Sequence, residues 1–432
     1  MEIKNVKGGY DFLPKEQKIR NYIKEVLKNV FEQYGYAPIE TPILCYYDIL
    51  VDKYDENNDI INEIYKLKDQ GNRNLGLRYD LTVPFCKCIA LNKNTIRFPF
   101  KRYEISKVFR DGPVKVGRDR EFTQCDVDVV GIEGQQVEAE LLSLYSYGFK
   151  KLGIDIIIKY NNRNLMKGLL KEAKITDDLI SPVITIVDKI NKITKEEFVT
   201  NLIYLDIEMN SINKILEYFN MSLKELNDAF IDTNNEDIKL GLTELNNLNQ
   251  YLVAMNMDKY CVFTSSLARG QEYYTGNVFE VYDKLARVTS SIGGGGRYDK
   301  IITNFINDAN TYPAVGISFG LTSIYEILKN DESLKDKSAI DIFIIPMGTP
   351  IESLKLANEF RNLGYKVDIE MVKRKIKNSM AYANKEKIPY VIVLGENEIE
   401  SNNFKIKDMI NNMEYNYNLD NILEFQKLYS RN

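Results

Sequence analysis

The sequence predicts an α+β protein with more than one domain, and three observations support this. At 432 residues the chain is long for a single hydrophobic core, so two or three domains are expected. Residues 1–160 mix helical and strand patterns, whereas residues 161–250 favour short helices. From residue 340 onward, apolar strand-like runs alternate with helical patterns, which is typical of a small α/β domain.

The first predicted element is an amphipathic helix over residues 17–34. Four apolar side chains repeat in it at helical spacing: Ile23, Leu27, Val30 and Phe31. Pro38 and Pro42 then interrupt the pattern and lead into extended segments.

Residues 161–250 are interpreted as a helical insertion, because the strand-rich pattern resumes at residue 259. Within it, Ser222 and Glu225 have the spacing of a capping box. The polar run over residues 329–338 is interpreted as a linker.

The C-terminal part predicts a βαβαβ order and hence a small three-layer domain. Its expected strands are residues 340–345, 367–371 and 389–394. The first helix between them carries Leu356, Phe360 and Leu363 on one face and ends at Gly364, and the second covers residues 375–385.

Composition excludes several classes of protein. No run approaches the ~20 apolar residues of a membrane helix, and the first residues lack the apolar stretch of a signal peptide. The five cysteines are scattered and odd in number, which favours free thiols in a reducing cytoplasm. The chain contains no histidine, so the C-x-C pair Cys86 and Cys88 is not expected to hold a metal. With a net charge of −5, nucleic acid could bind only through local basic patches.

Two neighbouring motifs predict a pocket for a small polar molecule and a nucleotide. Residues 269–276, RGQEYYTG, combine Arg269 with Tyr273 and Tyr274. Residues 291–299, SIGGGGRYD, place four glycines before Arg297. Arginine presents donors suited to carboxylate or phosphate, and glycine lets a backbone approach a ligand closely. The glycine run has neither P-loop nor dinucleotide-binding spacing, so it is interpreted as backbone lying flat against a ligand in an antiparallel sheet, or alternatively as a flexible loop.

Three further segments carry polar groups in strand-like patterns. Residues 101–128 read as strand, loop, strand, and period two places Phe122, Gln124, Asp126 and Asp128 on one face. Burying these polar groups would cost free energy unless they bind a ligand. A sheet with one solvent-exposed face is the simpler alternative. Asp80 and Thr82 are expected to share a strand face that could bind an ammonium group. Residues 314–320 present small side chains on one face of another expected strand.

Together these blocks resemble the histidyl-tRNA synthetase family, which belongs to the class II aminoacyl-tRNA synthetases. The resemblance runs from residues 7–14, KGGYDFLP, to the final α/β domain, and its most specific parts are residues 110–128, 269–276 and 293–299. It implies an antiparallel sheet flanked by helices in a catalytic domain of residues 1–330, with a helical insertion over about residues 161–250. Residues 338–432 would form an anticodon-binding domain. The resemblance also implies a cytoplasmic homodimer whose nucleic-acid partner is histidine tRNA and not DNA.

The resemblance also implies roles for individual residues. The histidine substrate would be held by Asp80, Thr82, Gln124, Asp128, Tyr273 and Tyr274. ATP would be bound by Arg110, Arg120, Phe122, Gly294, Gly295 and Arg297. Arg110 and Arg269 would supply fixed positive charge at the reacting phosphate, with Mg²⁺ accompanying ATP and no metal site in the protein itself.

The implied chemistry needs no histidine in the enzyme, because the substrate carboxylate is itself the nucleophile that attacks the α-phosphorus of ATP. The family pattern after Gly320 and Leu321 has an acidic residue and an arginine that contacts the γ-phosphate, whereas this chain has Thr322 and Ser323. Ser323 favours an alternative, a non-catalytic paralogue that serves as regulatory subunit of ATP phosphoribosyltransferase. A third interpretation is a tRNA-binding module that uses the basic residues Lys373, Arg374, Lys375 and Lys377.

Overall fold

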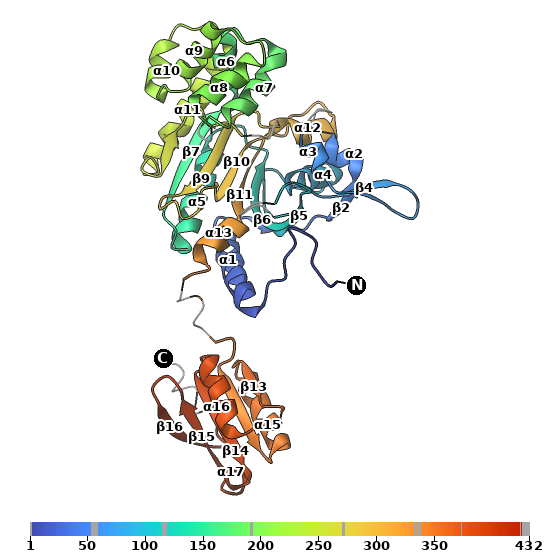
Figure 1. Cartoon of the computed structure of the whole chain (residues 1–432), viewed down its shortest axis with the longest axis vertical. Helices are drawn as coiled ribbons and strands as arrows, with labels where there is room; N and C mark the ends of the chain where they lie inside the picture. Colours follow the sequence, from blue (N-terminus) through green and yellow to red (C-terminus); the bar gives the residue numbers. More distant parts are fainter. Residues whose placement is uncertain are drawn as a thin grey trace. The chain divides into compact units, whose positions relative to one another are not determined.

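The computed structural model describes residues 2–52, 59–114, 119–190, 193–269, 273–331, 334, 338–372, 374–423 and 425. The chain divides into two compact units, residues 1–329 and 330–432, and each is described by itself (Figure 1). Within the described ranges, no helix is long and apolar enough to cross a membrane. The same ranges hold no group of three Cys, Asp or Glu side chains that could bind a metal ion.

The first unit is built on a large, mostly antiparallel sheet. In the described part of the chain its strand order is β1-β5-β6-β11-β10-β9-β7-β8, and only the edge pairs β1–β5 and β7–β8 are parallel. The strands are β1 (Ala37–Pro38), β5 (Phe100–Phe109), β6 (Glu121–Val130), β7 (Ile156–Asn162), β8 (Cys261–Phe263), β9 (Asn277–Asp283), β10 (Gly293–Arg297) and β11 (Ala314–Gly320). The glycine run is therefore a central strand, as expected, and not a flexible loop.

One face of this sheet is apolar and is covered by α1 (Pro14–Gln33), α5 (Gln136–Lys151) and α13 (Leu321–Leu328). Phe319 of β11 projects from this face, and its ring centroid lies 5.6 Å from that of Phe31 in α1 and 4.7 Å from that of Tyr145 in α5. The predicted N-terminal helix is confirmed, and its apolar residues are those that pack here. The other face of the sheet is thus left to carry the polar side chains.

Helices α4 (Thr82–Asn92) and α12 (Asp299–Ile306) pack together over one end of the polar face. A small sheet of β2 (Leu44–Tyr46), β4 (Asn74–Leu77) and β3 (Lys66–Lys68) leads into α4, beside α2 (Tyr47–Val51) and α3 (Asp59–Asn62). The expectation that Asp80 and Thr82 share a strand face is wrong, because β4 ends at Leu77 and Thr82 begins α4. Pro84 favours this outcome, since proline is tolerated in the first turn of a helix, where a free N–H has no partner.

Between β7 and β8 the chain forms a helical region. Its helices are α6 (Arg163–Glu172), α7 (Asp177–Val187), α8 (Lys195–Ile203), α9 (Met209–Tyr218), α10 (Leu223–Ala229) and α11 (Glu236–Ala254). The capping box predicted at Ser222 and Glu225 is confirmed at the start of α10. Because β7 and β8 pair with each other, the region leaves and re-enters the sheet at adjacent strands.

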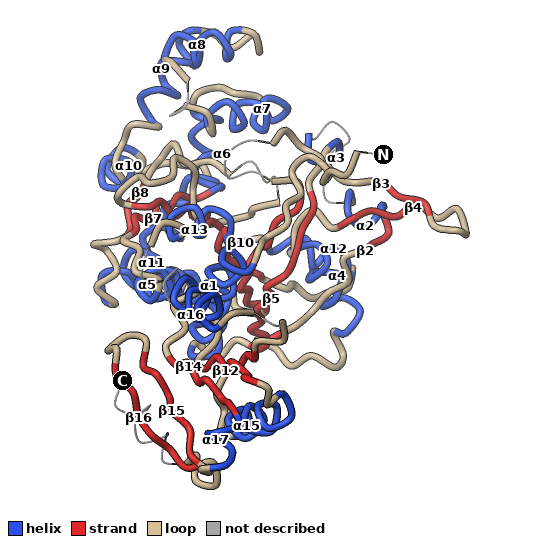
Figure 2. The backbone as a smooth tube through the Cα atoms, turned by 60° about the horizontal axis from the view of Figure 1, so that its bottom comes forward, coloured by secondary structure: helices blue, strands red, loops and turns tan. Residues whose placement is uncertain are grey.

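The second unit is a three-layer α/β structure. Strands β13 (Val367–Ile369), β12 (Ile342–Met347) and β14 (Tyr390–Gly395) are parallel, as predicted. Phe360 of α15 (Pro350–Asn362) packs with Ile342 on one face, and Ala383 of α16 (Ile376–Lys385) packs with Phe343 on the other. After α17 (Glu396–Glu400), β15 (Asn403–Asp408) and β16 (Met413–Asn418) add an antiparallel hairpin that the sequence pattern did not predict (Figure 2).

Candidate active site

A polar cavity lies on the open face of the main sheet, over its central strands. Strand register brings its floor together, because Gln124, Asp126 and Asp128 of β6 lie opposite Gly320, Ser318 and Gly316 of β11. Gly294 of β10 follows opposite Ser318. The cavity is lined by Asp80, Thr82, Arg110, Gln124, Asp126, Asp128, Arg269, Tyr273, Tyr274, Gly294, Gly295, Tyr298, Gly316, Ile317 and Ser318. Most of the predicted site residues, drawn from five distant segments, therefore meet in one place.

The glycines of β10 and β11 make room for side chains. A Cβ on Gly294 would lie 2.2 Å from Nη1 of Arg269, and a Cβ on Gly316 would lie 1.9 Å from Oδ1 of Asp128. A Cβ on Gly296 would lie 2.8 Å from the Tyr274 ring. The glycine strand thus presents a flat backbone, as predicted. The space directly above this backbone is occupied by Arg269 and Tyr274.

Arg269 is held firmly over the sheet. Its Nη1 donates to Oε1 of Glu280 at 2.9 Å, and its guanidinium lies 5.9 Å from the centre of the Tyr274 ring. Burial alone would lower the pKa of Arg269, but Tyr274 and Glu280 raise it above the ordinary value. Its Nε is buried and has no hydrogen-bond partner in the described structure, so a donor remains for a ligand. Gly270, Gln271 and Glu272 of this motif lie outside the described residues.

Asp128 is fixed from two sides at one end of the floor. It accepts a hydrogen bond from the Tyr298 hydroxyl, and its Oδ2 lies 2.6 Å from Nη2 of Arg102. Burial raises the pKa of Asp128, while Arg102 and Tyr298 oppose that effect. Arg102 is fully buried, and its guanidinium lies 4.2 Å from the centre of the Phe85 ring. Its ion pair with Asp128 does not have the geometry of a hydrogen bond. The fixed charge of Arg102 therefore favours an ionised Asp128 that can accept a ligand N–H.

The other end of the floor is formed by Gln124 and by the start of α4. Asp80 is 4% exposed, and its Oδ1 accepts from the backbone N–H of Val83 at 3.0 Å. Nε2 of Gln124 donates to Oγ of Ser318 at 3.2 Å, whereas its buried Oε1 has no hydrogen-bond partner in the described structure. A carboxylate, a hydroxyl on Thr82 and an open amide oxygen together suit an ammonium group.

Arg110 forms the rim of the cavity beyond Gln124. Its guanidinium lies 4.2 Å from the centre of the Tyr79 ring and 4.9 Å from that of Phe122. Phe122 and Arg120 do not line the cavity, although Phe122 touches Arg110, which does. Arg120 contacts Asp111 at 3.2 Å and donates from Nε to the Gly112 carbonyl oxygen. Phe122 is thus connected to the cavity through Arg110, and Arg120 through the loop that follows Arg110.

The predicted role of Arg297 in ATP binding does not agree with its position. Its Nε and Nη2 donate to the two carboxylate oxygens of Glu138 in α5, each at 2.8 Å, and Arg297 is 2% exposed. The alternation of β10 explains this, because Gly294 and Gly296 face the cavity and the next residue faces the helices behind the sheet. Arg297 is a buried structural cation in this fold.

Two cavity residues were not assigned a role from the sequence. Asp126 is 4% exposed and lies between Gln124 and Asp128 on β6. Burial raises its pKa to about 8, and the neighbouring Asp128 adds to the effect. Tyr298, which donates a hydrogen bond to Asp128, lies two residues after the glycine run. Ser323, which departs from the family pattern, lies in the first turn of α13 and is 8% exposed.

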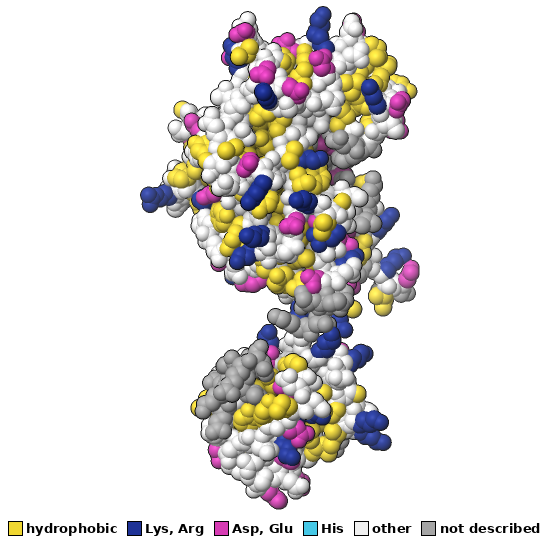
Figure 3. All heavy atoms as spheres, turned by 90° about the vertical axis from the view of Figure 1, so that its left-hand side faces the viewer, with side chains coloured by type: hydrophobic (Ala, Val, Ile, Leu, Met, Phe, Trp, Pro, Cys, Tyr) yellow, Lys and Arg dark blue, Asp and Glu magenta, His cyan; other side chains and the backbone are white. Residues whose placement is uncertain are grey.

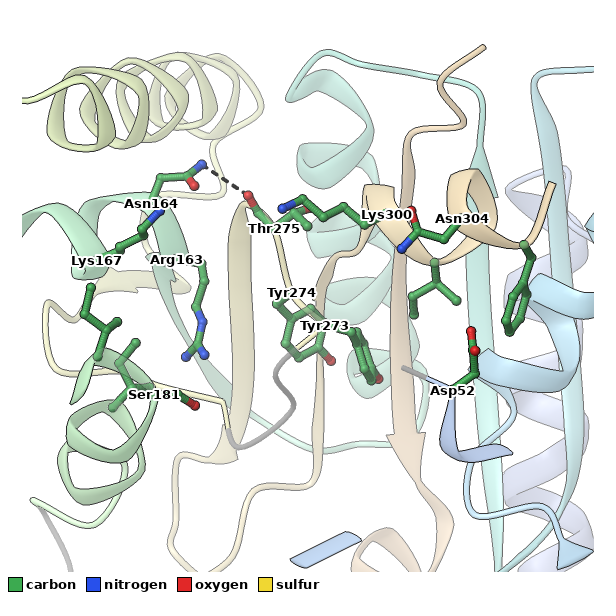
Figure 4. A pocket seen from close by; sticks show the side chains of 14 residues that line it. Asp52, Arg163, Asn164, Lys167, Ser181, Tyr273, Tyr274, Thr275, Lys300 and Asn304 are labelled. Atoms are coloured by element: carbon green, nitrogen blue, oxygen red, sulfur yellow. Dashed lines mark hydrogen bonds between the residues drawn. The ribbon is translucent and has the colours of Figure 1, made fainter. Parts of the chain in front are cut away.

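A second cavity, of about 450 Å³, adjoins the first across Tyr273 and Tyr274 (Figure 4). In Figure 4, Arg163, Asn164 and Lys167 of α6 lie on one side of these tyrosines and Asn304 of α12 lies on the other, while Lys300 of α12 extends above them. Asp52 contributes a carboxylate to the same wall. On the face drawn in Figure 3, by contrast, basic and acidic side chains are interspersed.

Comparison with known proteins identifies the family. The family model described as histidyl-tRNA synthetase matches residues 8–324, and the anticodon binding domain model matches residues 341–427. Histidine–tRNA ligase 1 of Bacillus cereus is 45% identical over 414 residues, covering 95% of this chain and 94% of its own length. Histidine–tRNA ligase of Clostridium tetani is 33% identical and covers 93% of both chains.

Solved structures agree in fold. Histidyl-tRNA synthetase from Nostoc superposes with a TM-score of 0.82 at 26% identity, covering 99% of both chains. A Bacillus halodurans protein described as ATP phosphoribosyltransferase regulatory subunit/histidyl-tRNA synthetase gives a TM-score of 0.75 at 20% identity, covering 91% of this chain and 99% of its own, and shows the fold alone. The matches across both units show that the chain belongs to the histidyl-tRNA synthetase family.

Proposed function

We propose that this protein is a histidine–tRNA ligase, which activates histidine with ATP to histidyl-adenylate and transfers it to the 3′ end of histidine tRNA. The observation that carries the proposal is the charge layout of the cavity. Its floor offers Asp80 and Gln124 at one end and Asp128 at the other, with Arg110 and Arg269 at the rim. An amino acid with an N–H-bearing side chain fits the floor, and its carboxylate then faces the arginines.

In this arrangement Asp80, Thr82 and Gln124 bind the substrate ammonium group. Asp128 accepts an imidazole N–H, because Arg102 and Tyr298 hold it in place from behind. Tyr273 and Tyr274, whose ring centroids are 4.7 Å apart, cover the imidazole. These contacts leave the carboxylate of histidine free to react.

In the activation step an oxygen of the histidine carboxylate forms a bond to the α-phosphorus of ATP, and pyrophosphate leaves. Arg110 and Arg269 neutralise the charge that builds up on the phosphate oxygens, so catalysis comes from positioning and electrostatics. Phe122 and Arg120 help to seat the nucleotide through Arg110 and the adjoining loop. Gly294 and Gly295 line the cavity, where Gly294 contributes by leaving room for Arg269. Mg²⁺ would arrive with the ATP phosphates, as the resemblance implies, and no step here depends on it.

For the transfer step, a terminal ribose hydroxyl of the tRNA must reach the adenylate. The second cavity offers such a path, because it opens beside Tyr273 and Tyr274 and carries Arg163, Lys167 and Lys300. The second unit would bind the anticodon, where Arg374 and Lys375 are available and Lys373 lies outside the described residues. We also propose that the enzyme is a cytoplasmic homodimer, on the resemblance alone.

A second candidate function is the regulatory subunit of ATP phosphoribosyltransferase, and Ser323 is the observation that favours it. A missing arginine would remove a charge-assisted contact worth about 1.5–3 kcal/mol from the γ-phosphate. The retained Arg110 and Arg269 and the presence of the anticodon domain favour the ligase.

Histidine-dependent exchange of pyrophosphate into ATP tests the proposal. The purified protein is compared with Arg269→Ala and with Arg287→Ala, a control that removes an arginine paired with Asp283 away from the cavity. Exchange that requires histidine, falls strongly in Arg269→Ala and persists in Arg287→Ala supports activation. Histidine binding without any exchange would instead favour the regulatory function.

A further inference from the structure

We propose that Asp126 is a further histidine-binding residue, which carries a proton in the free protein and releases it when the substrate ammonium group binds. This inference rests on the proposed function, since it takes histidine as the ligand. It adds to the site a residue that couples substrate binding to pH.

The first argument is the count of charges around the floor. The two carboxylates next to Asp126, one across on β5 and one along β6, each have an arginine within ion-pairing distance. Glu104 lies 3.0 Å from Arg78, and Asp128 lies 2.6 Å from Arg102. Among the described residues, Asp126 has no lysine or arginine nitrogen within 4 Å and is held only by neutral groups, Gln124 and Ser318.

The second argument is the identity of the groups that face Asp126. On its own strand Asp128 and Gln124 flank it, and Glu104 of β5 lies directly opposite. Ser318 of β11 lies opposite on the other side, and Asp80 faces it from the start of α4. The nearby cation, Arg102, is already paired with Asp128. Of these two carboxyls on one strand, only Asp128 is therefore paired with an arginine.

These surroundings favour the neutral form of Asp126. Burial is the main cause that raises its pKa to about 8; Arg102 opposes this effect, Asp128 adds to it, Ser318 opposes it and Asp80 adds to it. A carboxyl with that pKa is mostly protonated at pH 7 and loses its proton as the pH rises through the pKa.

An ammonium group on the floor reverses this preference. A cation within about 4–6 Å favours the ionised form of a carboxyl, so binding lowers the pKa of Asp126 and expels the proton. The direction of the proton exchange with solvent identifies its source. If histidine bound as an imidazolium, protons would be taken up on binding and not released. Release is therefore a signature of a protein group, and we expect more protons to be released per site at pH 7 than at pH 8.

Isothermal titration calorimetry measures this number directly. Histidine is titrated into the full-length protein, without ATP, in two buffers with different enthalpies of ionisation, at pH 7 and at pH 8. Asp126→Asn should bind histidine with release near zero. Asp308→Asn is the matched control, because this carboxyl is paired with Lys93 away from the cavity and should leave the release unchanged.

Ser318→Ala keeps the test decisive if Asp126→Asn fails to fold or to bind. The Ser318 hydroxyl lowers the pKa of Asp126, so its loss should increase the number of protons released at pH 8 relative to the wild type. Binding by the wild type without release, proton uptake, or unchanged release in Asp126→Asn would each overturn the inference. No binding of histidine to the wild type would instead overturn the proposed function.

Discussion

Substituting Gly294 by alanine should displace the guanidinium of Arg269 without changing any charged group. The new Cβ would lie 2.2 Å from Nη1 and 2.8 Å from Cζ of Arg269. Ordinary contact begins at 3.4 Å, so Nη1 must retreat by about 1.2 Å. The retreat also strains the 2.9 Å hydrogen bond to Glu280, which fixes the arginine over the strand.

The expected cost follows from the role of Arg269 at the reacting phosphate. A misplacement of about 1 Å in a catalytic group can lower a rate by about 100-fold. That loss corresponds to about 2.7 kcal/mol of transition-state stabilisation. Stability should change much less, since the strand keeps its hydrogen bonds to β9 and β11.

A double-mutant cycle in the pyrophosphate exchange assay tests this reasoning. Gly294→Ala should slow exchange about 100-fold in the wild type but add almost nothing in the Arg269→Ala background, because the clashing group is gone. Gly71→Ala is the control, since its Cβ would meet nothing closer than 3.4 Å. If Gly294→Ala lowered the exchange rate equally in both backgrounds, the inference that Gly294 makes room for Arg269 would be wrong.

Three other outcomes are expected. Glu138→Ala leaves Arg297 buried without its partner and should lower the free energy of unfolding by about 3–5 kcal/mol in urea denaturation. Glu326→Ala, in a partly exposed pair, should cost about 1 kcal/mol or less, and similar losses for both variants would contradict the structural role of Arg297. Asp128→Asn should raise the KM for histidine about 10- to 100-fold in the exchange assay and leave the KM for ATP nearly unchanged; a parallel rise in both would argue against imidazole recognition. Lys300→Ala should slow aminoacylation of tRNA several-fold and spare exchange, and a loss of exchange would remove the second cavity from the transfer step.

Elements with strong periodicity were predictable from the sequence. The helix α1 and the three parallel strands of the second unit follow from apolar spacing alone, because their buried faces are continuous. The hairpin β15–β16 was missed because only Phe404 and Ile406 are buried apolar residues in a largely polar stretch. Thr82 was placed on a strand because the sequence of Leu81, Thr82 and Val83 is also typical of a strand. Pro84, however, is equally compatible with the first turn of a helix.

The site itself was only partly predictable. Motifs identified the residues, and the alternation of β6 placed Gln124 and Asp128 on one face. Arg297 was misassigned because glycines carry no side chain to reveal which face of β10 its neighbours occupy. The unusual state of Asp126 depends on which arginine pairs with which carboxylate, and those pairs form between segments far apart in the sequence.

The pair of Arg297 and Glu138 belongs to a chain of buried hydrogen bonds that reaches the helical region. Asn277 donates to Glu138, and Asn162 donates to both Asn277 and Glu244 of α11. The backbone N–H of Arg163, at the start of α6, donates to the Gly276 carbonyl oxygen at 2.9 Å.

Nη1 of Arg297 also lies 3.4 Å from Oδ1 of Asp299, the first residue of α12, so both walls of the second cavity are joined to these buried hydrogen bonds. A movement of the helices that widened this cavity at its base would have to break directional bonds in the protein interior, where water cannot replace them. If the helical region swings when tRNA binds, its hinge must lie beyond the first turn of α6, and the mouth of the cavity, rather than its base, is the part that can open.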